Sequence, residues 1–246
     1  MSPLWLTAFL DLAADEHAAA TSFWQGVTAY GLSKPRGDHD EFATLVPADG
    51  DDYLRVQRTD DGTTGVHLDL HVDDVDGWAE RAEHLGATVV ARPGHVVLRS
   101  PGGLPFCLVT DGAEQRPAPA DHGGHTALVD QVTIDSPGPA YARECAFWAA
   151  LTGWPLQDGR ASEFMRIQTP AAQPLRILLQ QLDEPAGRTR AHLDLATTDR
   201  AAEIKRHETL GARVASEGRG WTVMTPPAGP VYCITDRDPA TGTVPA

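Results

Sequence analysis

Two stretches of the sequence repeat each other and decide how the chain is organised. HLDLHVDD occupies residues 67–74, and HLDLATTD occupies residues 192–199, so their starting positions differ by 125 residues. The Leu-Gly-Ala motifs at residues 85–87 and 210–212 keep the same spacing, and the Phe-Trp pairs at 23–24 and 147–148 differ by 124. Matches in one order at a nearly constant spacing predict two copies of one unit, with small gaps in the loops.

The repeat also sets the predicted domain boundaries. Residues 1–113 form the first copy and residues 126–238 form the second. Residues 114–125 are predicted to form a Pro/Gly linker, because Pro117 and Pro119 restrict the backbone of this stretch and Gly123-Gly124 makes it flexible. Residues 239–246 are predicted to be a tail.

Composition narrows the class of protein. The chain has 246 residues, of which 41% are hydrophobic, enough for two packed domains. Its formal net charge of -14 argues against nucleic acid and against an anionic membrane surface as partners. No long apolar run predicts a transmembrane helix, the first residues do not resemble a signal peptide, and the three cysteines are too scattered for a disulfide framework. We therefore expect a cytoplasmic protein.

Local patterns predict the order of helices and strands within each copy. Residues 67–72 are typical of a buried strand, and Asp73 or Asp74 is expected to cap a helix that ends at Gly86. A first strand at residues 4–11 and a helix ending near Val27 precede them, and short strands at residues 89–91, 96–99 and 106–109 follow. Each copy therefore looks like two βαβββ halves.

This pattern resembles the vicinal oxygen chelate superfamily, most closely its tandem glyoxalase-like and bleomycin-resistance-type proteins. The resemblance rests on the Phe-Trp pairs, on the His-Leu-Asp strands, and on Ser-Pro-Gly-Gly at residues 100–103 with Thr-Pro at 225–226. It implies an α+β fold of two tandem glyoxalase-like domains. Each domain would be a pair of βαβββ modules that form a curved sheet around a cavity.

Metal-using members of that superfamily take His and Glu ligands from four strands. The resemblance places these positions on Thr7, Gln57, His67 and Cys107 in the first copy, and on Gln131, Gln181, His192 and Tyr232 in the second. Only the histidine remains in each set, and neutral Thr, Gln and Tyr are poor ligands for a hard dication. No metal cofactor is therefore expected. The alternative is a divalent ion such as Mn, Fe, Ni or Zn, completed by Asp69 or Asp194.

The candidate catalytic residues are His67 with Asp69 and His192 with Asp194. Each pair is two residues apart on a predicted strand, so both side chains point to one face. Each histidine either satisfies a buried backbone carbonyl or its neighbouring Asp, or acts on a ligand as acid, base or hydrogen-bond donor. The candidate ligand-binding residues are Thr7, Gln57, His71, Cys107, Gln131, Gln181, Trp221 and Tyr232.

The sequence leaves three functions open. The first is binding of a small, partly apolar organic molecule without the family metal, as in sequestration of a toxic compound, by a monomer or weak homodimer. The second is a metal-dependent or His-based lyase, isomerase or dioxygenase. The third is a degenerate copy that serves as scaffold or dimer surface. This fits the second copy better, because Ala196 stands where the first copy has His71.

Overall fold

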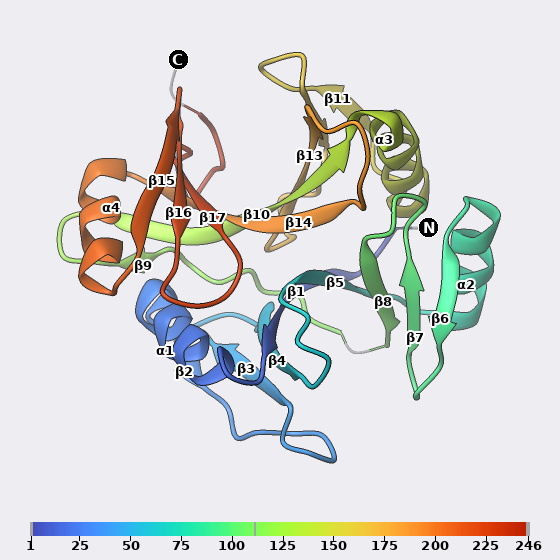
Figure 1. Cartoon of the computed structure of the whole chain (residues 1–246), viewed down its shortest axis with the longest axis horizontal. Helices are drawn as coiled ribbons and strands as arrows, with labels where there is room; N and C mark the ends of the chain where they lie inside the picture. The colour runs from blue at the N-terminus through green and yellow to red at the C-terminus, as the bar shows by residue number, and fades with distance from the viewer. Residues whose placement is uncertain (1, 111, 245–246) are drawn as a thin grey trace. The chain divides into compact units, whose positions relative to one another are not determined.

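The computed structural model describes residues 2–110 and 112–244 (Figure 1). Its helices are α1 (His17–Thr28), α2 (Val75–His84), α3 (Gly138–Thr152) and α4 (Arg200–Thr209). The strands before the linker are β1 (Trp5–Ala13), β2 (Gly31–Leu32), β3 (Phe42–Val46), β4 (Leu54–Thr59), β5 (Gly65–His71), β6 (Thr88–Ala91), β7 (Val96–Arg99) and β8 (Pro105–Val109). The remaining strands are β9 (Ala120–Asp121), β10 (Thr126–Pro137), β11 (Leu156–Asp158), β12 (Phe164–Ile167), β13 (Arg176–Leu182), β14 (Arg190–Thr197), β15 (Arg213–Gly218), β16 (Trp221–Thr225) and β17 (Tyr232–Thr235). Among the described residues, no helix has the length and apolar character needed to span a membrane.

The helix starts in the second half of each copy follow the predicted capping chemistry. Asp74 caps α2, and its side chain accepts a hydrogen bond of 3.1 Å from the backbone N–H of Gly77. Asp199 caps α4 in the same way, with a bond of 3.0 Å from Ala202. These bonds satisfy backbone donors that the first turn of a helix leaves without partners. Each helix then ends just before a glycine with positive φ, which is Gly86 in the first copy.

The chain forms two compact units that combine parts of both sequence copies. Unit 1 contains Met1–Ala8, His67–Glu114 and Val132–Ala191. Unit 2 contains Phe9–Val66, Gln115–Gln131 and His192–Ala246. Each unit therefore joins the second half of one copy to the first half of the other. The boundaries of the two copies remain a prediction from the sequence.

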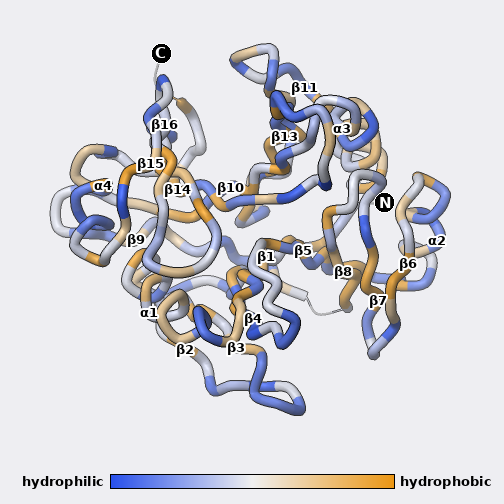
Figure 2. Tube along the Cα trace, in the orientation of Figure 1, coloured by the Kyte–Doolittle hydropathy of each residue, from blue (hydrophilic) through white to orange (hydrophobic). Residues whose placement is uncertain are grey.

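Unit 1 contains two runs of strands. The first is β1-β5-β8-β7-β6, to which β1 contributes its first residues, and the second is β11-β12-β13-β10. Strands β5 and β8 are parallel, whereas β6, β7 and β8 pair as antiparallel neighbours. Between β5 and β8 the chain forms α2, β6 and β7. This long crossover connects the parallel pair, because two parallel strands cannot be joined by a tight turn. Strands β7 and β8 are largely hydrophobic, whereas the loop between β2 and β3 in unit 2 is hydrophilic (Figure 2).

Unit 2 has the same plan with the roles of the copies exchanged. Its runs of strands are β2-β3-β4-β1 and β10-β14-β17-β16-β15. Strands β14 and β17 are parallel and occupy the places that β5 and β8 take in unit 1. Mixed sheets with four helices in the described residues confirm the predicted α+β class.

Aromatic packing in each unit joins the last strand of one copy to the first helix of the other. In unit 1 the ring of Phe106 lies 5.9 Å from Phe147 and 5.3 Å from Trp148, centroid to centroid. In unit 2 Tyr232 lies 5.8 Å from Phe23 and 5.3 Å from Trp24. All six side chains are buried, and such pairs contribute about 0.5–1.5 kcal/mol beyond their buried area. The Phe-Trp pairs that revealed the repeat therefore hold the two copies together within each unit.

Candidate functional site: two buried His–Asp–Cys clusters

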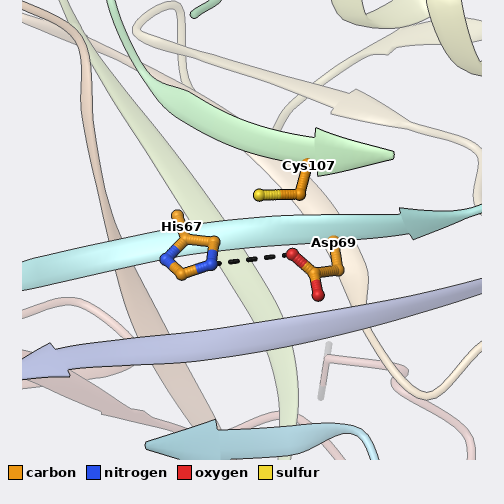
Figure 3. Close-up of side chains that lie close together, drawn as sticks. All are labelled: His67, Asp69 and Cys107. Carbon is orange, nitrogen blue, oxygen red and sulfur yellow. Dashed lines mark ion pairs between the residues drawn. The ribbon is translucent and has the colours of Figure 1, made fainter. Parts of the chain in front are cut away.

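The first cluster consists of His67, Asp69 and Cys107, all in unit 1 (Figure 3). His67 and Asp69 point to the same face of β5, and Asp69 is the register partner of Cys107 on the parallel strand β8. Nε2 of His67 lies 3.6 Å from Oδ1 of Asp69, and one donor atom from each residue lies within 4.8 Å of the others. The three residues are only 8%, 4% and 7% exposed, so the cluster places an imidazole, a carboxylate and a thiol inside the unit.

The thiol of the first cluster is not an activated nucleophile. Burial raises the pKa of Cys107, and this effect outweighs the opposing hydrogen bond from His67. Because the thiolate is the reactive form, a raised pKa keeps the side chain protonated and unreactive at neutral pH. The histidine and the carboxylate are therefore the groups of this cluster suited to hydrogen bonding or proton transfer.

The second cluster repeats this arrangement in unit 2 with His192, Asp194 and Cys233. Nε2 of His192 lies 3.2 Å from Oδ1 of Asp194 and 3.5 Å from Sγ of Cys233. Asp194 on β14 is the register partner of Cys233 on the parallel strand β17, as Asp69 is of Cys107. The same three residue types thus meet at the same register in both copies.

The carboxylate of Asp194 in the second cluster has further polar neighbours at its second oxygen, Oδ2. Gln131 on β10 donates a short hydrogen bond to Oδ2 of Asp194. Nη1 of Arg237 lies 4.0 Å from the same oxygen, while the rest of that guanidinium binds Asp130 through bonds of 2.6 and 3.3 Å. Burial alone lowers the pKa of Arg237, but Asp130 and Asp194 outweigh burial and raise it. Arg237 therefore stays charged and partly balances the carboxylate of the second cluster.

The structure brings together some of the predicted residues and separates others. Thr7 on β1 bonds to His71 instead of approaching the cluster, with Oγ1 2.8 Å from Nε2, and both side chains are buried. Gln57 is half-buried on β4 in unit 2, and Gln181 is exposed at the end of β13 in unit 1. Trp221 on β16 is half-buried and covers Gly218, where an added Cβ would overlap its ring.

Tyr232 lies away from the second cluster, and Cys233 takes the position beside His192. The hydroxyl of Tyr232 is 2.6 Å from Nδ1 of His207, and its ring packs against α1. Successive side chains of a strand point to opposite faces, so a shift of one residue moves a side chain to the other side of the sheet. The fixed spacing of 125 hid this shift. The triplets Phe106-Cys107-Leu108 and Tyr232-Cys233-Ile234, both aromatic–Cys–aliphatic, reveal it.

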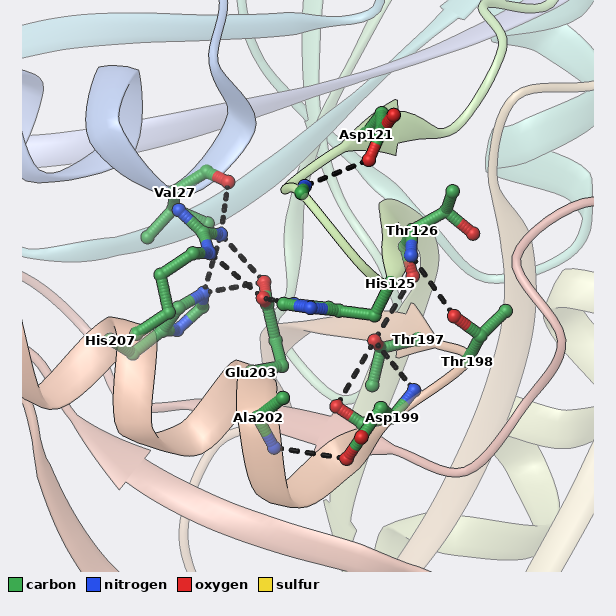
Figure 4. Close-up of polar contacts among 12 residues, drawn as sticks. Val27, Asp121, His125, Thr126, Thr197, Thr198, Asp199, Ala202, Glu203 and His207 are labelled. Atoms are coloured by element: carbon green, nitrogen blue, oxygen red, sulfur yellow. Dashed lines mark hydrogen bonds and ion pairs between the residues drawn. The ribbon is translucent and has the colours of Figure 1, made fainter.

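A second buried polar network surrounds Glu203 in unit 2 (Figure 4). Glu203 on α4 accepts from Arg206 at 2.8 and 2.6 Å, and its oxygens lie 2.8 Å from His207 and 2.7 Å from His125. Arg206 also donates to the carbonyls of Gly26 and Val27 near the end of α1, both at 2.7 Å. Glu203 and His207 are fully buried. This network is therefore a clamp between α4 and α1, and sequence analysis did not find it.

The chain is similar to known proteins over nearly all of its length. The model of the family described as Glyoxalase-like domain matches residues 7–109 and again residues 131–235. These matches cover more than half of the chain, which therefore belongs to the glyoxalase-like domain family as a tandem repeat. No curated protein matches it.

Solved structures show the same fold. A Mn(II)-bound glyoxalase from Novosphingobium aromaticivorans superposes with a TM-score of 0.65 at 18% identity, over 95% of this chain and 82% of that one. The 2,2',3-trihydroxybiphenyl 1,2-dioxygenase from Sphingomonas wittichii strain RW1 gives 0.64 at 16% identity, over 95% and 90%. A mutant of 4-hydroxymandelate synthase from Streptomyces coelicolor gives 0.64 at 14%, over 94% and 92%. The predicted resemblance to the vicinal oxygen chelate superfamily is confirmed.

The residues present do not fit the His and Glu ligand set of the metal-using relatives. The hydroxyl of Thr7 forms a hydrogen bond with His71, and the hydroxyl of Tyr232 forms one with His207. The amide N–H of Gln131 donates to Asp194. A hard Mn or Fe ion of the oxygenase type takes imidazole and carboxylate donors around open positions. Each cluster supplies instead one imidazole, one carboxylate and one thiol.

Proposed function

We propose that this glyoxalase-like protein binds a small, partly apolar organic molecule, and that the His–Asp pair of a cluster contacts the polar group of that molecule. The observation that carries the proposal is the repetition of a largely buried His–Asp–Cys cluster at one register in both copies. Burying an imidazole and a carboxylate costs desolvation free energy that their mutual attraction often does not return in full, so a stable core does not require such a pair twice. Small-molecule sites, in contrast, join apolar walls to a few placed polar groups.

In this proposal the histidine is the residue that meets the ligand. Asp69 lies against Nε2 of His67 and fixes the orientation of the imidazole, and Asp194 does the same for His192. An imidazole held in this way donates a hydrogen bond or accepts a proton. The buried cysteine contributes packing and a weak donor. The names of the structural neighbours support a small aromatic ligand, because they include a trihydroxybiphenyl dioxygenase and a 4-hydroxymandelate synthase.

A His-based lyase or isomerase is the second candidate. It is favoured by the ion-pair geometry of His192 and Asp194 at 3.2 Å, because a carboxylate beside an imidazole stabilises the protonated form that arises when a histidine acts as base. Binding without turnover would correspond to sequestration, as in bleomycin-resistance-type proteins. The predicted cytoplasmic location and the predicted monomer or weak dimer stay predictions.

The proposal is tested by quenching of tryptophan fluorescence in the presence of a chelator, with catechol and 2,2',3-trihydroxybiphenyl as probes. We expect saturable quenching, weakened about tenfold by His67→Gln or by His192→Gln, since a hydrogen bond to a ligand contributes about 1.4 kcal/mol. His84→Gln, which changes an exposed histidine on α2, is the matched control and should bind as the unmodified chain does. Absence of saturable quenching by both probes, or equal affinity in all three variants, would contradict the proposal.

A further inference from the structure

Three arginine side chains of unit 1 meet at the turn between β7 and β8. Nη1 of Arg99 donates to the carbonyl of Gly103 at 3.3 Å. Nη2 of Arg143 on α3 donates to the carbonyl of Pro101 in the same turn at 2.5 Å. The side chain of Arg188 lies against Gly103, with its Cδ 3.4 Å from the position that an added Cβ would take. Three separate segments of the chain therefore bring a positive charge to one short turn.

These guanidinium groups keep donors that the protein does not use. Arg143 and Arg188 are exposed, and Arg99 is half-buried. None of the three forms an ion pair with another residue that the structure describes. A guanidinium has five N–H donors, and the bonds to the turn occupy only one donor each of Arg99 and Arg143. The turn therefore holds two of the arginines in place while most of their donors stay available to a ligand.

One acidic side chain contacts the turn, and it faces the interior of unit 1. Glu144 is fully buried and accepts from the backbone N–H of Gly102 at 2.5 Å and from the indole of Trp148 at 2.9 Å. Burial raises the pKa of its carboxyl group, although these hydrogen bonds and Arg143 oppose that effect. The carboxylate of Glu144 thus binds donors inside the unit, and the outer side of the turn carries the arginines.

Unit 2 builds the equivalent turn, between β16 and β17, without these arginines. The repeat spacings of 124 and 125 place the following residues at the equivalent positions: Met224 for Arg99, Ala19 for Arg143 and Thr63 for Arg188. The same plan of strands and helices therefore forms when all three positions are uncharged. The fold does not require the three arginines, so their meeting at one turn of unit 1 calls for a separate role.

We propose that this arginine cluster, which consists of Arg99, Arg143 and Arg188, binds the phosphate or sulfate group of a small molecule. A guanidinium presents its N–H groups as a planar fork that matches the oxygens of such a group. An acidic surface of a second copy also has the matching charge. Two chains that each carry a net charge of -14 repel one another, however, and three side chains at one turn match a compact oxyanion better than an extended interface.

Calorimetric titration of the full-length chain with inorganic pyrophosphate, and separately with sulfate, tests the proposal in low-salt buffer that contains a chelator. We expect saturable binding that added salt weakens, and the tighter of the two probes identifies the group. Arg143→Gln and Arg188→Gln should each weaken binding about tenfold, because each removes a charged donor. Arg143→Lys keeps the charge without the fork and should weaken binding less. Arg213→Gln removes the same charge from an exposed position on β15 and should bind as the unmodified chain does.

Three results would overturn the proposal. They are no saturable binding of either probe, equal affinity in Arg188→Gln and Arg213→Gln, and a dimer in size-exclusion chromatography that Arg143→Gln converts to a monomer. The side chain of Arg188 forms no hydrogen bond with a residue that the structure describes, so its replacement tests binding without disturbing the fold. Catechol carries no phosphate or sulfate, so the fluorescence experiment on the His–Asp–Cys clusters and this titration fail or succeed independently.

Discussion

Replacing Glu203 with Gln should destabilise the chain strongly, although the side chain keeps its size. Glu203 is fully buried and receives two bonds from Arg206 at 2.8 and 2.6 Å, with His207 at 2.8 Å and His125 at 2.7 Å. Burial alone raises the pKa of Glu203, but hydrogen bonds from Arg206, His207 and His125 outweigh burial and hold the pKa far below its usual range. The folded structure therefore stabilises the charged form, which Gln cannot supply.

The size of the effect follows from these contacts. A hydrogen bond to a charged group contributes about 1.5–3 kcal/mol, and removal of one partner from a buried ion pair typically costs about 3–5 kcal/mol. Because Gln turns an amide N–H toward side chains that were donating to Glu203, we expect a loss of about 3–5 kcal/mol. A loss of that size is a large part of the total stability of a domain, which is about 5–15 kcal/mol.

Urea unfolding at pH 7, followed by circular dichroism, measures the loss. Glu208→Gln is the matched control, because it removes the same charge from an exposed position on the same helix. Surface changes of this kind usually alter stability by less than about 0.5 kcal/mol. If Glu203→Gln lowers the free energy of unfolding no more than Glu208→Gln does, the clamp between α4 and α1 contributes nothing and the reasoning is wrong.

Two further predictions concern acid stability and packing. Burial lowers the pKa of His207 despite the opposing effect of Glu203. Below about pH 6.5 His207 is therefore protonated in the unfolded chain before it is protonated in the folded chain, and the free energy of unfolding should fall from pH 7 to pH 5. Urea unfolding across that range should show a smaller fall for His207→Gln, and equal falls would contradict this assignment. Gly102→Ala should cost about 1–3 kcal/mol, because the added Cβ would overlap Oγ1 of Thr189 and lie 2.9 Å from Oε1 of Glu144. Gly65→Ala, where an added Cβ meets nothing within 4 Å, is its control in thermal melting, and equal melting temperatures for the two variants would count against this packing.

The sequence predicted what depends on neighbours along the chain. The alternation in residues 67–72 was sufficient to predict β5 and the common face of His67 and Asp69, and the pair Asp73-Asp74 was sufficient to predict the start of α2 to within one residue. These features follow from the period of a strand and from backbone donors at a helix start, which are local properties. The His–Asp half of each cluster was therefore accessible without a structure.

The other half of each cluster depends on how distant strands align. Cys107 meets Asp69 only because β8 returns beside β5 after α2, β6 and β7, and no local pattern fixes that register. The same limit explains the misplacement of Tyr232, since a spacing of 125 and a spacing of 126 are equally compatible with a repeat that has gaps. Packing decides between them, because an aromatic residue at Phe106 or Tyr232 must face a Phe-Trp pair.

The exchange of halves between the copies connects the fold to the site. Phe106 and Cys107 are consecutive on β8, so the strand that packs its aromatic ring against Trp148 of the other copy presents its thiol to Asp69 on the opposite face. Tyr232 and Cys233 repeat this relation with Trp24 and Asp194. The contact that joins the copies therefore also fixes the register of each cysteine. A change such as Phe106→Ala should consequently weaken the small-molecule binding assigned to the first cluster in the quenching experiment, even though this ring lies on the opposite face of the strand from Cys107.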